Sequence, residues 1–141
     1  MSELRSLLGG RGVFHSPGNA ENLPKERGTY ILILRLSSPL RVRTAYGFTT
    51  VNPGVYAYVG SAFGPGGLRA RILRHWRRDK RVHWHIDWIT TVEGCEHVGA
   101  LVFVEERIES ELARKLSSRF PSVPGFGASD SEEDSHLFKI V

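Results

Sequence analysis

The sequence has a single cysteine and no long apolar run. One thiol, Cys95, excludes an internal disulfide and a zinc site built from several thiolates. The longest apolar stretches, such as residues 30–34, fall far short of the roughly 18–20 residues needed to span a bilayer. The first residues include an early acidic side chain and no apolar core, which argues against a secretory signal. We therefore expect a cytoplasmic protein that is not bound to a membrane.

The motifs of several enzyme classes are also missing. The glycine turn at residues 64–67 is followed by Leu68 and Arg69, where a P-loop needs a lysine and a hydroxyl. A dinucleotide fingerprint would need glycine at position 69, and no Gly-x-Ser-x-Gly elbow occurs. His83, His85 and Asp87 form an H-x-H-x-D segment, but tryptophan follows where a di-zinc hydrolase has another histidine. A local pair between His83 and Asp87 fits this segment better.

The positive charge of the chain is concentrated in one segment. Residues 69–81 carry a net charge of +6, while the other 128 residues sum to −2. A cationic cluster of this density favours phosphate through Coulomb attraction and counterion release, although a solvated helix face has the same pattern. The side chains expected to contact nucleic acid, DNA or RNA, are Arg69, Arg74, His75, Arg77, Arg78, His83 and His85.

The order of the apolar patterns predicts an α+β fold. Strands are expected at residues 29–36, 40–46, 55–60, 98–104 and 137–141, and helices at 68–79, 83–91 and 107–119. Because strands come first and helices later, we expect a small mixed or antiparallel sheet flanked by helices. Residues 1–27 are expected to be an irregular N-terminal extension, residues 28–141 a single domain, and residues 121–134 a loop.

Two polar residues lie at defined angles on the expected helices. Arg71 shares a stripe with His75 beside an apolar seam that begins at Leu68, which suits either a phosphate contact or packing over aliphatic side chains. Glu109 falls on the apolar side of its helix, stacked over Leu112. A carboxylate there needs a partner, either a structural arginine or a divalent cation.

Four short motifs occur in the order that marks the GIY-YIG nuclease superfamily, which the chain resembles. They are Gly28-Thr29-Tyr30, Tyr58-Val59-Gly60, Leu68-Arg69-Ala70-Arg71 and Glu109-Ser110-Glu111-Leu112. The wider run, from GTY through HWHIDW to GFGASD and SHLF, is similar to a mostly archaeal, functionally uncharacterised branch of that superfamily. Members of that branch occur alone or fused to a base-excision-repair glycosylase. The ordered set covers residues 28–138.

What the resemblance implies is a metal-dependent DNA endonuclease, acting in DNA repair or processing, on a three-stranded antiparallel core. Tyr58 would help to deprotonate the attacking water and Tyr30 would orient it. Arg71 would bind the scissile phosphate, and Glu109 would be the sole protein ligand of one Mg²⁺ or Mn²⁺. Gly60 would let DNA or backbone approach closely. The alternative is a nucleic-acid-binding module without catalysis, which uses the basic segment alone.

The chain departs from the family's pattern in two places. The two tyrosines are separated by 27 residues, more than the family usually has, so an inserted hairpin arm that contains residues 40–46 is expected. Many members carry a late asparagine near the site, for which the sequence has no clear match. Asp130 or His136 is expected to occupy that neighbourhood.

Overall fold

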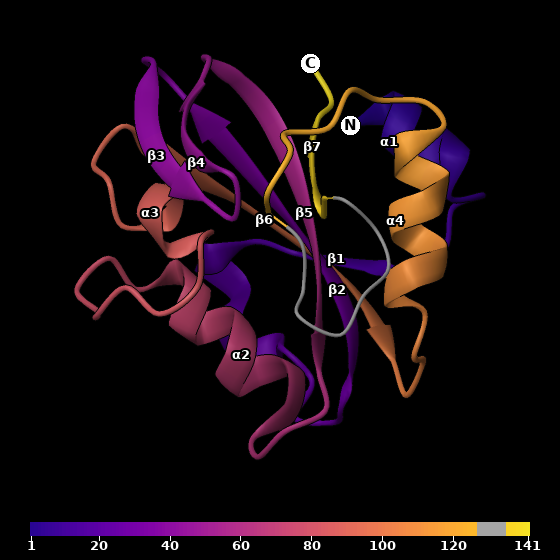
Figure 1. Ribbon diagram of the computed structural model, residues 1–141. Coiled ribbons are helices and arrows are strands. Elements are labelled where there is room, and N and C mark those ends of the chain that lie inside the picture. The colour runs from indigo at the N-terminus through magenta and orange to yellow at the C-terminus, as the bar shows by residue number, and fades with distance from the viewer. Residues whose placement is uncertain (127–134) are drawn as a thin grey trace.

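The computed structural model describes residues 1–126 and 135–141, and it confirms the α+β class (Figure 1). Within the described residues, five strands form an antiparallel sheet in the order β1-β6-β2-β5-β7, and β3 and β4 form a separate hairpin. The strands are β1 (Val13–His15), β2 (Gly28–Leu36), β3 (Leu40–Thr44), β4 (Gly47–Val51), β5 (Gly54–Ala62), β6 (Cys95–Val104) and β7 (Leu137–Lys139). The helices are α1 (Ser2–Leu7), α2 (Gly67–Trp76), α3 (Asp87–Thr90) and α4 (Glu109–Ser117), with a 3-10 helix η1 (Pro17–Asn22).

Strand β2 is the centre of the sheet because its sequence is apolar toward both faces. Eight of its nine residues are buried, as expected for a strand that is covered on two sides. It pairs along its whole length with β5 and with β6. These three strands are the predicted core of the sheet.

The two faces of the sheet carry two separate apolar layers. On one face, called the α2 side, α2, α3 and the β3-β4 hairpin pack over Tyr30, Leu32 and Leu34 (Figure 1). On the other, called the α4 side, α1 and α4 pack over Ile31 and Ile33. The alternation of side chains along β2 therefore decides which residues meet which helix.

The first 27 residues are more regular than expected. Helix α1 buries Leu4 on the α4 side, and β1 extends the sheet by pairing Val13 with Val102 of β6. The prediction of an irregular extension is wrong. Elements of six and three residues have little intrinsic stability, and contacts with distant parts of the chain stabilise them here.

The predicted helices are present but shorter. Helix α2 ends at Trp76, where the Lys80 ammonium caps it by donating to two carbonyls of its last turn. Of the helix expected at 83–91, only α3 forms. Trp88 is 40% exposed and lies outside the core. Strand β4 was not predicted, and residues 127–134 of the expected loop lie outside the described residues.

None of the helices among the described residues combines the length and the apolar composition that a bilayer crossing requires.

Candidate active site

Two tyrosines lie on neighbouring strands beneath α2. Tyr30 of β2 is paired with Gly60 of β5, and Tyr58 precedes Gly60 by two residues, so both phenols project from the same face. Tyr30 is 2% exposed, while Tyr58 is partly buried against the same apolar layer. Tyr58 is thus the more accessible of the two phenols.

Gly60 is required by the ring of Tyr30. A β-carbon at position 60 would lie 2.4 Å from the Tyr30 hydroxyl oxygen and 2.5 Å from the adjacent ring carbon. The space beside this glycine is therefore filled by the tyrosine. The expectation that DNA or another backbone segment approaches there is wrong in this structure.

His75 lies behind Tyr30 and not on the surface. Its Nε2 atom is 2.7 Å from the Tyr30 hydroxyl, and its side chain is 1% exposed. Burial, followed by the charge of Lys80, lowers the pKa of His75 to about 3, so the imidazole is neutral at pH 7. The prediction that His75 contacts nucleic acid is wrong because the ring is enclosed.

Arg71 is held on the α2 side by two contacts. Its Nη1 donates to the Ser61 carbonyl at 3.1 Å, and its guanidinium carbon lies 4.7 Å from the ring centroid of Trp84. A guanidinium fixed by a hydrogen bond and by an aromatic face loses much of its rotamer freedom. The remaining donors keep the planar fork that binds phosphate oxygens.

Glu109 begins α4 and meets His136 from the segment before β7. Its side chain is 15% exposed, and its Oε2 lies 3.7 Å from Nδ1 of His136. That nitrogen is also 3.0 Å from the Val59 carbonyl, which can only accept, so Nδ1 carries a hydrogen. The expectation that His136 lies near the site is confirmed, whereas Asp130 lies outside the described residues.

The electrostatics connect the four predicted catalytic residues. Burial raises the pKa of Tyr30, and Tyr58 and Glu109 raise it further, while Arg71 lowers it. Burial likewise raises the pKa of Tyr58, with Glu109 as the next cause, and Arg71 again opposes the shift. The pKa of each phenol is therefore affected by the Glu109 carboxylate and by the Arg71 guanidinium. Both are protonated at neutral pH.

Several cations of the basic segment are bound to the protein itself. Arg69 donates to the carbonyls of Glu21 and Leu23 at 2.6 and 3.0 Å. Arg78 donates to two backbone carbonyls in the segment that leads into β6. These contacts fix the fold and leave fewer donors for a phosphate, so nucleic-acid contacts of both residues stay predictions.

Arg74 forms a buried ion pair that sequence reasoning missed. Its two terminal nitrogens lie 3.1 and 2.9 Å from the carboxylate oxygens of Asp87, whose side chain is fully buried. The backbone N–H groups of His83 and Trp84 also donate to Asp87. The expected pairing of Asp87 with His83 is thus a backbone contact. The sequence signal for this ion pair was an aspartate between Ile86 and Trp88, because a carboxylate buried among apolar residues needs a cation as its partner.

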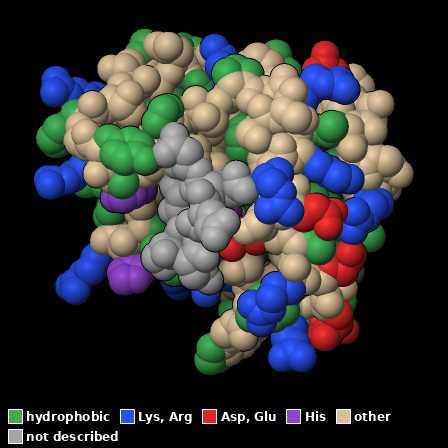
Figure 2. Space-filling view, turned by 45° about the vertical axis from the view of Figure 1, so that its right-hand side comes forward, with side chains coloured by type: hydrophobic (Ala, Val, Ile, Leu, Met, Phe, Trp, Pro, Cys, Tyr) green, Lys and Arg blue, Asp and Glu red, His purple; other side chains and the backbone are tan. Residues whose placement is uncertain are grey.

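The remaining predicted contact residues lie near the surface. Arg77 and His83 are exposed, and the His83 ring meets the edge of Trp84 at a centroid distance of 5.2 Å. His85 is partly buried beside Phe126. On the face in Figure 2, acidic side chains gather on the right among Lys and Arg side chains, while the left part of the view shows Lys, Arg and His side chains without acidic ones.

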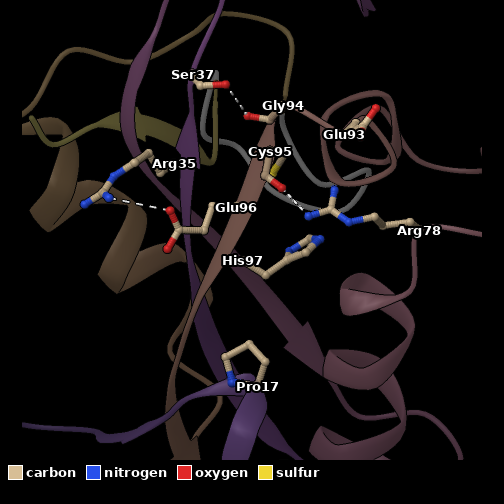
Figure 3. Close-up of a pocket in the computed structure, with 9 residues that line it drawn as sticks. All are labelled: Pro17, Arg35, Ser37, Arg78, Glu93, Gly94, Cys95, Glu96 and His97. Atoms are coloured by element: carbon tan, nitrogen blue, oxygen red, sulfur yellow. Dashed lines mark hydrogen bonds and ion pairs between the residues drawn. The ribbon is translucent and has the colours of Figure 1, made fainter.

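A groove of about 510 Å³ lies where β6 begins (Figure 3). Arg35 and Glu96 form an exposed ion pair there, and the guanidinium of Arg78 projects toward the Cys95 carbonyl. Burial raises the pKa of Cys95 to about 11, which keeps the thiol protonated and unreactive. None of the four predicted catalytic residues lines this groove.

The donor set near Glu109 suits a hard cation that is held by few protein ligands. Within residues 1–126 and 135–141, no group of three His, Cys, Asp or Glu side chains is arranged to hold a metal ion. Mg²⁺, however, is commonly bound by one or two carboxylates and completes its shell with water and substrate phosphate. The partly exposed carboxylate of Glu109 fits that mode.

A protein-family model matches most of the chain. A family model described as "Domain of unknown function DUF123" matches residues 29–141, which is most of the chain. No curated protein and no solved structure matches it. The chain therefore belongs to the family of the domain of unknown function DUF123.

Proposed function

We propose that this protein is a GIY-YIG-type nuclease that hydrolyses phosphodiester bonds in DNA with the aid of Mg²⁺ or Mn²⁺. One observation carries the proposal: Tyr30 and Tyr58 project from one face of two neighbouring strands, and the charges of Arg71 and Glu109, far apart in the sequence, both act on the pKa of each phenol. Phosphodiester hydrolysis can use such groups, because negative charge develops on the phosphate oxygens while a water molecule loses a proton.

Arg71 binds the scissile phosphate in this proposal. Its guanidinium is oriented by the Ser61 carbonyl and the Trp84 ring before any substrate arrives. A pre-oriented cation stabilises the transition state without reorganisation during the reaction. The neighbouring Arg74 is paired with Asp87, whereas the charge of Arg71 lowers the pKa of both phenols.

In this proposal Tyr58 first loses its own proton to solvent, and the resulting phenolate accepts the proton of the attacking water. Tyr30 orients that water or the ring of Tyr58. The partial exposure of Tyr58 allows contact with water, whereas Tyr30 is enclosed and bonded to His75. A divalent cation on Glu109 would stabilise charge on the phosphate oxygens and offset the carboxylate that raises the pKa of Tyr58. Water attacks phosphorus as the bond to the leaving oxygen breaks.

The test is cleavage of supercoiled, nicked, flap and branched DNA in Mg²⁺ or Mn²⁺ by wild type, Glu109→Ala and Arg71→Ala. The matched control is Glu111→Ala, because Glu111 lies on the same helix but pairs with Arg11 at 3.3 Å. We expect cleavage by wild type and Glu111→Ala and none by the other two. Cleavage that survives Glu109→Ala contradicts the assignment.

The alternative is a non-catalytic nucleic-acid-binding module. It predicts metal-independent, salt-sensitive binding with no cleavage of any substrate. The exposed Arg77 and Arg81, which continue the basic segment beyond α2, are the observation in its favour.

A further inference from the structure

The β3-β4 hairpin presents two arginines and an aromatic ring on its outer face. Side chains alternate along the hairpin, so Val42 and Val51 enter the core while Arg41, Arg43 and Phe48 face outward. Phe48 is 61% exposed. An exposed aromatic ring of this size costs free energy in water unless a partner covers it.

The two guanidiniums flank this ring. Arg43 is directly opposite Phe48 in the hairpin register, and Arg41 is two residues earlier on the same face. Their guanidinium carbons lie 5.9 and 5.1 Å from the ring centroid. Cation–π contact holds the two cations over the ring, and Phe48 as a whole still exposes most of its surface to solvent.

The charge of this face is not neutralised by the described carboxylates. Arg11, Arg27 and Arg35 each form an ion pair with a glutamate. Within residues 1–126 and 135–141, neither Arg41 nor Arg43 has such an ion pair. Two cations on one small face therefore favour an anionic partner.

The hairpin lies on the α2 side of the sheet, the side of the two tyrosines. Its inner residues Val42 and Val51 belong to the same apolar layer as Tyr30 and Ile72. Helix α3 packs against β3 and α2. The hairpin is thus packed against the layer that contains Tyr30 and contacts Tyr58.

We propose that this outer face binds single-stranded nucleic acid, with Phe48 stacked on an unpaired base and Arg41 and Arg43 on neighbouring phosphates. Aromatic platforms flanked by cations bind single strands in this way, because every base offers a flat apolar face. The inference deepens the proposed function and rests on it for the class of partner. It implies substrates with an unpaired segment, such as flaps or branches.

The experiment measures binding of a fluorescent 15-nucleotide oligothymidine and of a duplex of equal length, with EDTA present so that cleavage cannot interfere. The full chain is compared with Arg41→Ala/Arg43→Ala, Phe48→Ala and Phe48→Tyr. The matched control is Arg114→Ala/Arg119→Ala, which removes the same charge from exposed positions at the α4 end of the molecule. Thermal unfolding checks that each variant is folded, as expected for exposed positions.

We expect the double arginine variant to weaken oligothymidine binding at least tenfold and to reduce the slope of log K against log salt by about 1.4. Phe48→Ala should weaken oligothymidine binding about 5- to 100-fold, whereas Phe48→Tyr should bind oligothymidine as tightly as the wild type. Equal oligothymidine binding by all hairpin variants, or an equal loss in the α4 control, overturns the inference. So does a stronger effect on the duplex than on the single strand.

A second binding experiment, with anionic vesicles, distinguishes a membrane partner from a nucleic-acid partner. If the hairpin variants lose binding to vesicles with one quarter phosphatidylserine while oligothymidine binding is unchanged, the partner is a lipid surface and the proposal is wrong.

The experiments can contradict the nuclease proposal and the hairpin proposal independently of each other. Metal-dependent cleavage with hairpin-independent binding removes only this inference, and hairpin-dependent binding without cleavage removes only the nuclease.

Discussion

A methyl group at position 60 would lie 2.4 Å from the hydroxyl oxygen of Tyr30. Backbone and ring are both fixed there, because the two residues are paired in the centre of the sheet and the ring is enclosed. The identity of residue 60 therefore controls the position of a candidate catalytic phenol.

Gly60→Ala should destabilise the fold by about 1–3 kcal/mol, as overpacking does, and should reduce any cleavage by displacing Tyr30. Urea unfolding and the cleavage assay measure the two effects. Gly64→Ala is the control, since a β-carbon there would meet only an Arg71 nitrogen at 4.0 Å. If Gly60→Ala is as stable and active as wild type, the packing argument is wrong.

The two tyrosines should respond differently to loss of the hydroxyl. Tyr58→Phe should reduce the cleavage rate by about 10²–10⁴, the usual range for a proton-transfer group, with little change in stability. Tyr30→Phe should also lower the free energy of unfolding by about 1–3 kcal/mol, because the Nε2 of buried His75 loses its partner. Single-turnover cleavage and chemical denaturation on the same samples distinguish the two roles. If Tyr58→Phe lost stability and Tyr30→Phe lost only cleavage, the roles of the two tyrosines would be exchanged.

The neutral state of His75 should make the fold sensitive to acid. Burial, and next Lys80, holds its pKa at about 3, against 6.5 for an exposed histidine. The unfolded chain therefore binds the proton first, and stability falls as the pH drops from about 6.5 toward 3 by up to roughly 4–5 kcal/mol. His75→Gln should flatten this dependence in urea titrations. His83→Gln, at an exposed position, should leave it unchanged.

Asp87 should contribute stability over a lower pH range. Burial raises its pKa, but hydrogen bonds from Arg74 and from the N–H groups of Trp84 and His83 lower it more, to about 2. This stability, about 2 kcal/mol, is complete above pH 4 and is lost as the pH falls through 2.

At pH 7, Asp87→Asn should lower the free energy of unfolding by about 3–5 kcal/mol, because Arg74 is left without its counter-charge. The variant should also lack the loss of stability between pH 4 and 2. Asp79→Asn, at an exposed position in the same basic segment, is the control. A neutral effect of Asp87→Asn would show that the ion pair does not hold α3 to α2.

The central strands were predictable because their sequences carry the information locally. The run TYILILRL is apolar at nearly every position, which permits a strand buried on both faces and little else. Strand β4, GFTTV, has few apolar residues and forms only through its pairing with β3. Likewise β1 forms by pairing with β6, nearly ninety residues later in the chain, so no local sequence pattern predicts it.

The motif order proposes a set of site residues, but it could not give the partners of each one. The set is Tyr30, Tyr58, Arg71 and Glu109, and the charges of Arg71 and Glu109 act on the pKa of both phenols. The periodicity of α2 could not distinguish a cation facing solvent from one bonded to a distant group. That distinction separates Arg77 from Arg74, because only tertiary structure brings Asp87 to the helix.

Because Glu109 lies at the first turn of α4, its backbone should open more readily than the strand that carries Tyr30. Strand β2 has neighbours on both sides, so the amide of Tyr30 should exchange with solvent only when the whole molecule opens. The first turn of a helix lacks internal partners for its N–H groups, and Thr29 supplies one acceptor for Ile108. Deuterium uptake at this turn should therefore slow when a cation binds, while uptake at the tyrosine strands stays constant.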